Sequence, residues 1–163
     1  MKLNKIELLL GSLLSMIGCS DGKTMPEGQL VSLQYSTNAC MAENEYEGSL
    51  ERDSTGSFVV RSMLEYYGPM YEKRIDSTAV EHFKEIIKEE KMYLYKSSYQ
   101  PSMEVLDGWG WSFRAKFSDG KSIISGGSNA SPKGNGLSRI CAYMQELAKD
   151  GTLVENTDSL TKE

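Results

Sequence analysis

The chain contains one histidine, His82, and the chemistry open to it is limited. Nucleophilic or acid–base catalysis would need this imidazole held between a carboxylate and a Ser or Cys nucleophile. His82 comes directly before Phe83 and falls off the apolar stripe of its predicted helix, so we expect it to be solvated. The sequence has no HExxH motif and no cysteine pair beside a histidine, so it predicts no catalytic set, no metal site and no cofactor.

Four other residues are better suited to binding a ligand. Tyr95 and Trp109 are aromatic side chains of the kind that stack on sugars or peptides. Asp107 lies two positions before Trp109, and Asn129 belongs to the glycine-rich stretch 126–136. We therefore predict a candidate ligand patch of Asp107, Trp109, Tyr95 and Asn129. The alternative is that Asp107 only bonds its own turn and that the aromatic rings pack in the core.

Three cysteines are present, at positions 19, 40 and 141. Exported proteins meet an oxidising compartment, so Cys40 and Cys141 could form one disulfide. It would close a loop of about 100 residues and contribute about 4–5 kcal/mol in the chain-entropy model. The alternative is two free thiols, with Cys141 acting as a small apolar residue on a helix.

The N-terminus has the anatomy of a secretory signal. Lys2 and Lys5 precede an apolar run over residues 8–17 that is too short to span a bilayer. The sequence M-I-G-C, which ends at Cys19, resembles the bacterial lipobox. The resemblance implies cleavage before Cys19 and acylation of its thiol and new amine. The alternative is an ordinary signal peptide that is cut elsewhere.

The composition predicts a globular protein, and the acidic net charge argues against binding to nucleic acid. The 163 residues are 39% apolar and 25% charged, which suits one domain with a core. The net charge is −5, and no basic stripe is present to neutralise phosphates. Together these features predict a lipoprotein signal peptide over residues 1–18, a tether over 19–28, a single domain over 29–150 and a disordered tail over 151–163.

Periodicity predicts the elements that would position these residues. Alternating apolar residues indicate strands over 30–36, 45–52, 57–66, 109–117 and 122–126, with a short further strand over 70–75. In the segment 109–117, the tryptophans share a face with Phe113, and Arg114 and Lys116 share the other. The pair Asp119-Gly120 predicts a type I′ hairpin turn. Helical spacing predicts helices from about 77 to 91 and from 137 to 149.

This order predicts an α+β fold, in which an antiparallel sheet of about five strands has two helices packed on one face. The other face would be open to water or to a partner.

The lipobox, the small β-rich domain and the run W-S-F-R-A-K-F-S-D-G followed by G-G-S-N-A-S-P are similar to small uncharacterised lipoproteins of gut Bacteroidetes. The resemblance implies an outer-membrane lipoprotein of the cell envelope, facing the periplasm or the surface, and brings no activity with it. Three Asp-Ser pairs, at Ser54, Ser77 and Ser159, resemble the O-glycosylation sequon of exported proteins in these bacteria.

We therefore expect a non-enzymatic binding or interaction module on a lipid anchor. Its partner would be a protein or a glycan, bound at the open sheet face or at the loop 126–136. The alternative is a hydrolase or inhibitor acting on cell-wall or host material.

Overall fold

The computed structural model describes residues 23–39, 45–103, 105 and 108–154. Its main element is a β-sheet whose strands alternate apolar and polar side chains. Along β6 every second side chain from Trp111 to Phe117 is buried, and those between them are exposed. The strands are β1 (Leu30–Ala39), β2 (Tyr46–Arg52), β3 (Phe58–Met63), β4 (Met70–Ile75), β5 (Ser98–Tyr99), β6 (Trp109–Phe117), β7 (Ser122–Ser128) and β8 (Thr152–Leu153).

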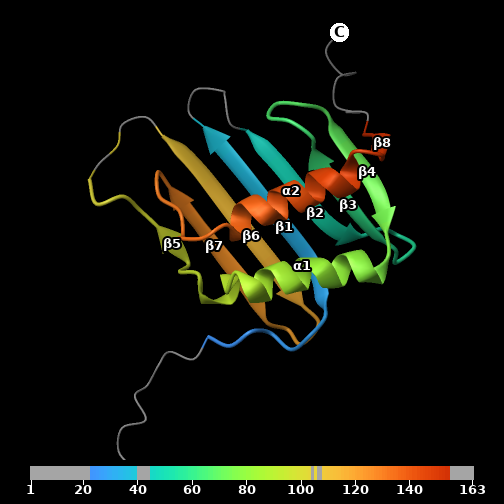
Figure 1. Ribbon diagram of the computed structural model, residues 1–163, viewed down its shortest axis with the longest axis horizontal. Helices are drawn as coiled ribbons and strands as arrows, with labels where there is room; N and C mark the ends of the chain where they lie inside the picture. The colour runs from blue at the N-terminus through green and yellow to red at the C-terminus, as the bar shows by residue number, and fades with distance from the viewer. Residues whose placement is uncertain (1–22, 40–44, 104, 106–107, 155–163) are drawn as a thin grey trace, which may run out of the picture.

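The strands pair in the order β5-β7-β6-β1-β2-β3-β4-β8 (Figure 1). The α+β class is confirmed, but the prediction of about five antiparallel strands is wrong. Eight strands form a mixed sheet, because β5 pairs in parallel with β7. Both β5 and β8 have only two residues, which is too short for an alternation pattern to reveal.

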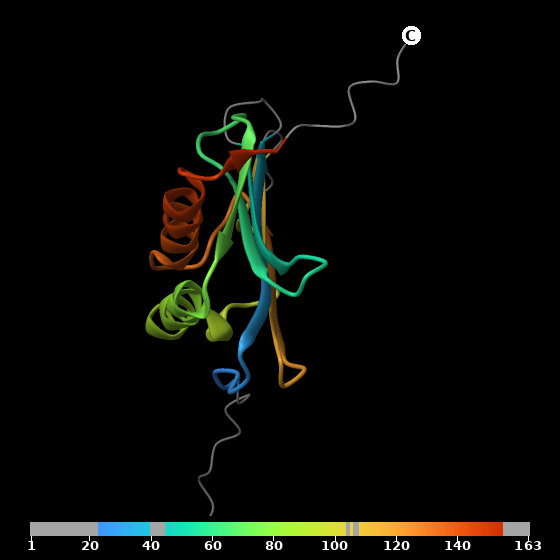
Figure 2. The ribbon, with the colours of Figure 1, turned by 90° about the vertical axis from the view of Figure 1, so that its right-hand side faces the viewer.

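Two helices, α1 (Ser77–Glu89) and α2 (Gly136–Ala148), cover one face of the sheet (Figure 2). Asp76 caps α1, because its Oδ1 accepts a hydrogen bond from the Ala79 N–H at 2.9 Å. The single-turn 3-10 helix η1 (Met92–Leu94) follows α1. The core between the layers includes Leu33, Leu50, Val60, Phe83, Ile87, Phe113, Ile140 and Met144, all almost fully buried. Each such side chain contributes roughly 1.5–3 kcal/mol through burial.

The turn between β6 and β7 differs from the predicted type I′ turn. The Phe117 N–H donates to the Lys121 carbonyl at 3.0 Å, and the Gly120 N–H donates to the Phe117 carbonyl at 3.1 Å. Gly120 has a φ of 80°, whereas Asp119 is not in the left-handed region. The loop therefore has three residues, in the arrangement of a type I turn followed by a glycine.

The two ends of the described chain pack against the sheet. Residues 23–28, which were predicted to belong to a tether, include the buried Pro26. After α2 the chain enters β8, which pairs with β4, so ordered structure continues past residue 150. No helix in the described part of the chain has the length and apolar character needed to cross a membrane.

Candidate functional site

The sheet face opposite the helices is polar, and several of its side chains bond to one another. Arg61 donates to Glu72 at 3.0 Å across β3 and β4. The Gln34 amide donates to Glu51 at 2.9 Å, and the hydroxyls of Ser36 and Ser112 lie 2.9 Å apart. These pairs satisfy several of the polar side chains on this face within the protein.

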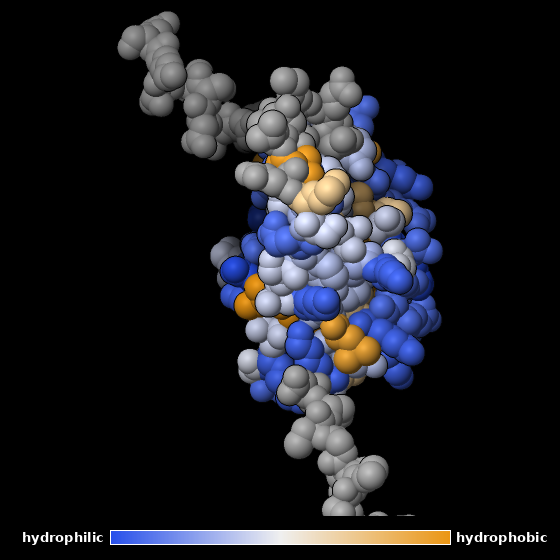
Figure 3. Space-filling model, turned by 90° about the vertical axis from the view of Figure 1, so that its left-hand side faces the viewer, coloured by the Kyte–Doolittle hydropathy of each residue, from blue (hydrophilic) through white to orange (hydrophobic). Residues whose placement is uncertain are grey.

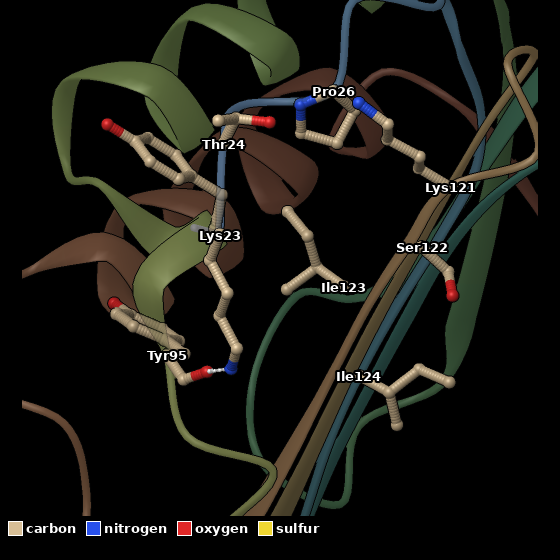
Figure 4. Close-up of a pocket in the computed structure, with 9 residues that line it drawn as sticks. Lys23, Thr24, Pro26, Tyr95, Lys121, Ser122, Ile123 and Ile124 are labelled. Carbon is tan, nitrogen blue, oxygen red and sulfur yellow. Dashed lines mark hydrogen bonds between the residues drawn. The ribbon is translucent and has the colours of Figure 1, made fainter. Parts of the chain in front are cut away.

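The β6–β7 hairpin carries cations that have no such partners. Arg114 and Lys116 on β6 form no salt bridge with any carboxylate in the described ranges, and we call these two residues the cationic patch. Lys121, in the turn, points instead toward Pro26 (Figure 4), and its charge attracts the Asp119 carboxylate. Arg61, Arg74 and Arg139, in contrast, are each ion-paired. The patch therefore offers uncompensated positive charge on a chain whose net charge is −5.

An apolar side chain lies directly beside this patch. Ile124 is 55% exposed and is the register partner of Arg114, so the two side chains are neighbours on the open face.

The edge of the sheet next to the patch is only half covered. β5 pairs with β7 at Gly126 and Gly127, and the Gly126 N–H donates to the Ser97 carbonyl at 3.2 Å, away from β6. In an antiparallel pair the outward direction recurs at every second residue, so the main-chain groups of Ile124 and Ser122 also point outward. Neither residue has a main-chain hydrogen bond along this edge to any described residue.

A groove runs along this uncovered half of β7 (Figure 4). Its volume is about 400 Å³. Ile123 points into it, whereas Ile124 points to the other face of the sheet. We call it the edge groove, and its lining residues are Lys23, Thr24, Pro26, Tyr93, Tyr95, Lys121, Ser122, Ile123 and Ile124.

The walls of the edge groove combine apolar surface with positive charge. Ile123 and Tyr95 are each 7% exposed, and Pro26 is buried. Burial raises the pKa of Tyr95 to about 12, so its phenol is neutral at physiological pH. The ammonium group of Lys23 donates to the Tyr95 carbonyl at 2.6 Å. The lining contains two lysines, Lys23 and Lys121, and no carboxylate.

The edge viewed from outside is weakly polar. Figure 3 faces β5 and β7 and shows a pale band with exposed apolar side chains near its two ends. Among the exposed apolar residues of the described chain are Leu94, Ile124, Met103, Val105 and Trp109.

The residues of the predicted ligand patch are divided between separate places. Tyr95 lines the edge groove, whereas Asn129 lines another hollow, of about 290 Å³, formed with Gln100 to Met103 and Val105. The Trp109 side chain is 39% exposed, and the main-chain N–H of Trp109 donates to Asn129 Oδ1 at 3.0 Å. The structure thus joins Trp109 to Asn129 and places Tyr95 elsewhere. Asp107 lies outside the described residues.

His82 lies on the surface of α1. Its Nδ1 is 3.0 Å from Glu85 Oε2, and its ring packs edge-on against Tyr143 at 4.6 Å. No cluster of three or more potential metal ligands occurs among the residues that the structure describes.

Cys141 is half-buried on α2, and burial raises the pKa of its thiol. Cys19 and Cys40 lie outside the described residues, so acylation and the disulfide both stay predictions. Ser54 and Ser77 are exposed, and Ser159 falls in a part that is not described.

Arg114 and Lys116 were predicted to lie on the face opposite the tryptophans but were not among the predicted site residues. The signal was the alternation itself, which set two cations on one exposed face. No local sequence pattern indicates that Lys23 and Ile124 belong to the site, because their roles depend on which strand lies at the edge of the sheet. No protein-family model matches this chain, and no curated protein matches its sequence.

Proposed function

We propose that the protein is a lipid-anchored, non-enzymatic binding module of the bacterial cell envelope, which binds an acidic protein segment at the cationic patch and edge groove. The observation that supports this most is the charge of Arg114 and Lys116, which form no salt bridge among the described residues, beside the exposed Ile124. Opposite charge steers a partner to such a patch, and an apolar neighbour adds contact area once it has docked.

The binding proposal is tested by reversing the charge of the patch. We expect the double variant Arg114→Glu/Lys116→Glu to bind poly-L-glutamate about tenfold or more weakly than the wild type, because two attractive contacts become repulsive. Fluorescence anisotropy at low and physiological salt measures this, and higher salt should weaken wild-type binding.

A matched control makes the same change in net charge elsewhere. Lys133→Glu/Lys149→Glu alters two exposed lysines distant in sequence from the patch and should leave binding within about twofold. An equal loss in both double variants, or no binding of poly-L-glutamate by the wild type, would refute the proposed site. Binding of polygalacturonate in preference to poly-L-glutamate would assign the patch to an acidic glycan instead.

The anchor rests on the lipobox resemblance at Cys19. Cells that express the wild-type chain should incorporate labelled palmitate into it, and Cys19→Ala should abolish incorporation and leave the precursor uncut. Processing of Cys19→Ala at the wild-type rate would identify an ordinary signal peptide.

A further inference from the structure

The uncovered half of β7 has free hydrogen-bonding groups in the geometry of a strand edge. Ser122 and Ile124 each direct an N–H and a carbonyl outward, and β5 occupies only the other half of the strand. Such a row of groups is a template for another extended chain. An extended segment beside Ser122–Ile124 would lie in the edge groove, in line with β5.

The two faces of an added strand would meet different surroundings. Successive side chains of a strand point to opposite faces. On the helix side they would meet Ile123, Tyr95 and Pro26, which favour apolar groups. On the open side they would meet Ile124 with Arg114 and Lys116 behind it, which favour acidic groups.

A second copy of this chain fits the edge poorly. Pairing β7 with β7 of another copy would put two cationic patches on the same face of one continuous sheet, where their like charges repel each other at low ionic strength. The charge at the edge is instead complementary to an acidic segment.

We infer that the edge groove binds an extended peptide as an additional strand beside Ser122–Ile124 of β7, and that this peptide alternates apolar with acidic side chains. The inference rests on the proposed function, because it specifies the form and chemistry of the partner at the same site. Main-chain hydrogen bonds would supply affinity, and the two sets of side chains would supply selectivity.

The test uses a fluorescein-labelled octapeptide of alternating valine and glutamate. Two further octapeptides carry N-methyl groups, one on every valine and the other on every glutamate. Only one set of amides faces β7 in a given strand direction, so one methylated peptide should lose at least tenfold in affinity for the wild type and the other should not. This comparison needs no protein variant.

A matched pair of variants probes the same contact from the protein side. Ile124→Pro removes an outward N–H and no hydrogen bond to β6, whereas Ile124→Ala removes the side chain and keeps the N–H. We expect Ile124→Pro to bind the octapeptide at least tenfold more weakly than Ile124→Ala. Both variants lack the Ile124 side chain, so any loss in poly-L-glutamate binding should be the same in the two.

The outcomes separate the two proposals. Equal binding of both methylated peptides, with binding still lost in Arg114→Glu/Lys116→Glu, would overturn strand addition and leave the proposed function in place. Failure of the wild type to bind the octapeptide while it binds poly-L-glutamate would do the same. Self-association of the wild type that Ile124→Pro abolishes would assign the edge to a second copy and also overturn the inference.

Discussion

Asp119 joins two distant segments of the chain through one side chain. Its Oδ2 accepts hydrogen bonds from the N–H groups of Glu27 and Gly28, each at 3.1 Å, and its Oδ1 accepts one from Lys121 at 3.1 Å. Partial desolvation raises the pKa of this carboxyl, but the three backbone N–H groups outweigh that effect and hold the pKa below its usual range. Asp119 thereby fixes the segment that forms one wall of the edge groove.

Replacement of Asp119 by asparagine should lower stability in a pH-dependent way. The folded state has the lower pKa, so the carboxylate stabilises it fully above the unfolded value of about 3.9, and this stabilisation is lost as the pH falls through the folded value. The Tm of Asp119→Asn should therefore fall below that of the wild type at pH 7, and the gap should narrow towards pH 2.5. The exposed Asp150→Asn is the control, and an equal gap at both pH values would contradict the assignment.

The same residue shows what local sequence can and cannot predict. The pair Asp119-Gly120 correctly predicts a hairpin between two alternating strands. The bonds from Asp119 to Glu27 and Gly28 join residues 92 and 91 positions apart, so no local pattern reports them. Arg114 and Lys116 were assigned to the exposed face by alternation, but their lack of a carboxylate partner depends on which strands are neighbours.

At the scale of elements, strands with a long alternation of apolar and polar residues were predicted from the sequence, and strands without it were not. β6 has nine residues of strict alternation, and its bounds agree with the prediction. β7 was expected to end at Gly126 but continues to Ser128, because glycine and serine carry no hydropathy signal. β5 forms only because the chain after η1 meets β7, with the Ser125 hydroxyl donating to the Lys96 carbonyl at 2.6 Å. Long-range pairing of that kind is invisible to local propensity.

Asn129 closes the open end of the β6–β7 hairpin. This structural role explains why an asparagine occupies the position, and no bound ligand is needed to explain it. It has a φ of 51°, its N–H donates to the Trp109 carbonyl at 2.9 Å, and its Oδ1 accepts the Trp109 N–H. We expect Asn129→Ala to destabilise the fold by about 1–2 kcal/mol, because alanine is disfavoured in the left-handed region and cannot accept that bond. Asn129→Gly should cost less, because glycine adopts this φ freely.

Urea unfolding of the two Asn129 variants beside the wild type measures this order. An alanine variant as stable as the wild type, or a glycine variant less stable than the alanine variant, would show that backbone strain does not set the residue at this position.

At the scale of the whole molecule, the edge groove belongs to no single element. Its walls come from residues 23–26, 93–95 and 121–124, which meet only because β7 lies next to the two-residue β5 at the end of the sheet. The sequence predicted that one sheet face would stay uncovered, but the strand order that creates the groove follows from the assembled sheet. If Cys19 carries lipid, Lys23 follows it by four residues, at most about 14 Å of extended chain, so the groove would open close to the membrane surface.

The predicted disulfide would join α2 to the segment that follows β1 in the sequence. The Cys141 thiol on α2 lies close enough to the Tyr46 hydroxyl at the start of β2 to affect its pKa, and Tyr46 pairs with Thr37 near the end of β1. Cys40 follows the last residue of β1 in the sequence and lies outside the described residues.

We therefore expect protein isolated from the cell envelope without reductant to contain a Cys40–Cys141 disulfide. Alkylation before and after reduction, read by mass spectrometry of the tryptic peptides, should label both cysteines only after reduction. The bond should stabilise the fold by up to about 4–5 kcal/mol in the chain-entropy model, so reductant should lower the Tm of the wild type and leave Cys141→Ser unchanged. Full alkylation of both thiols without reductant would show that both are free and that Cys141 acts as a small apolar residue on α2.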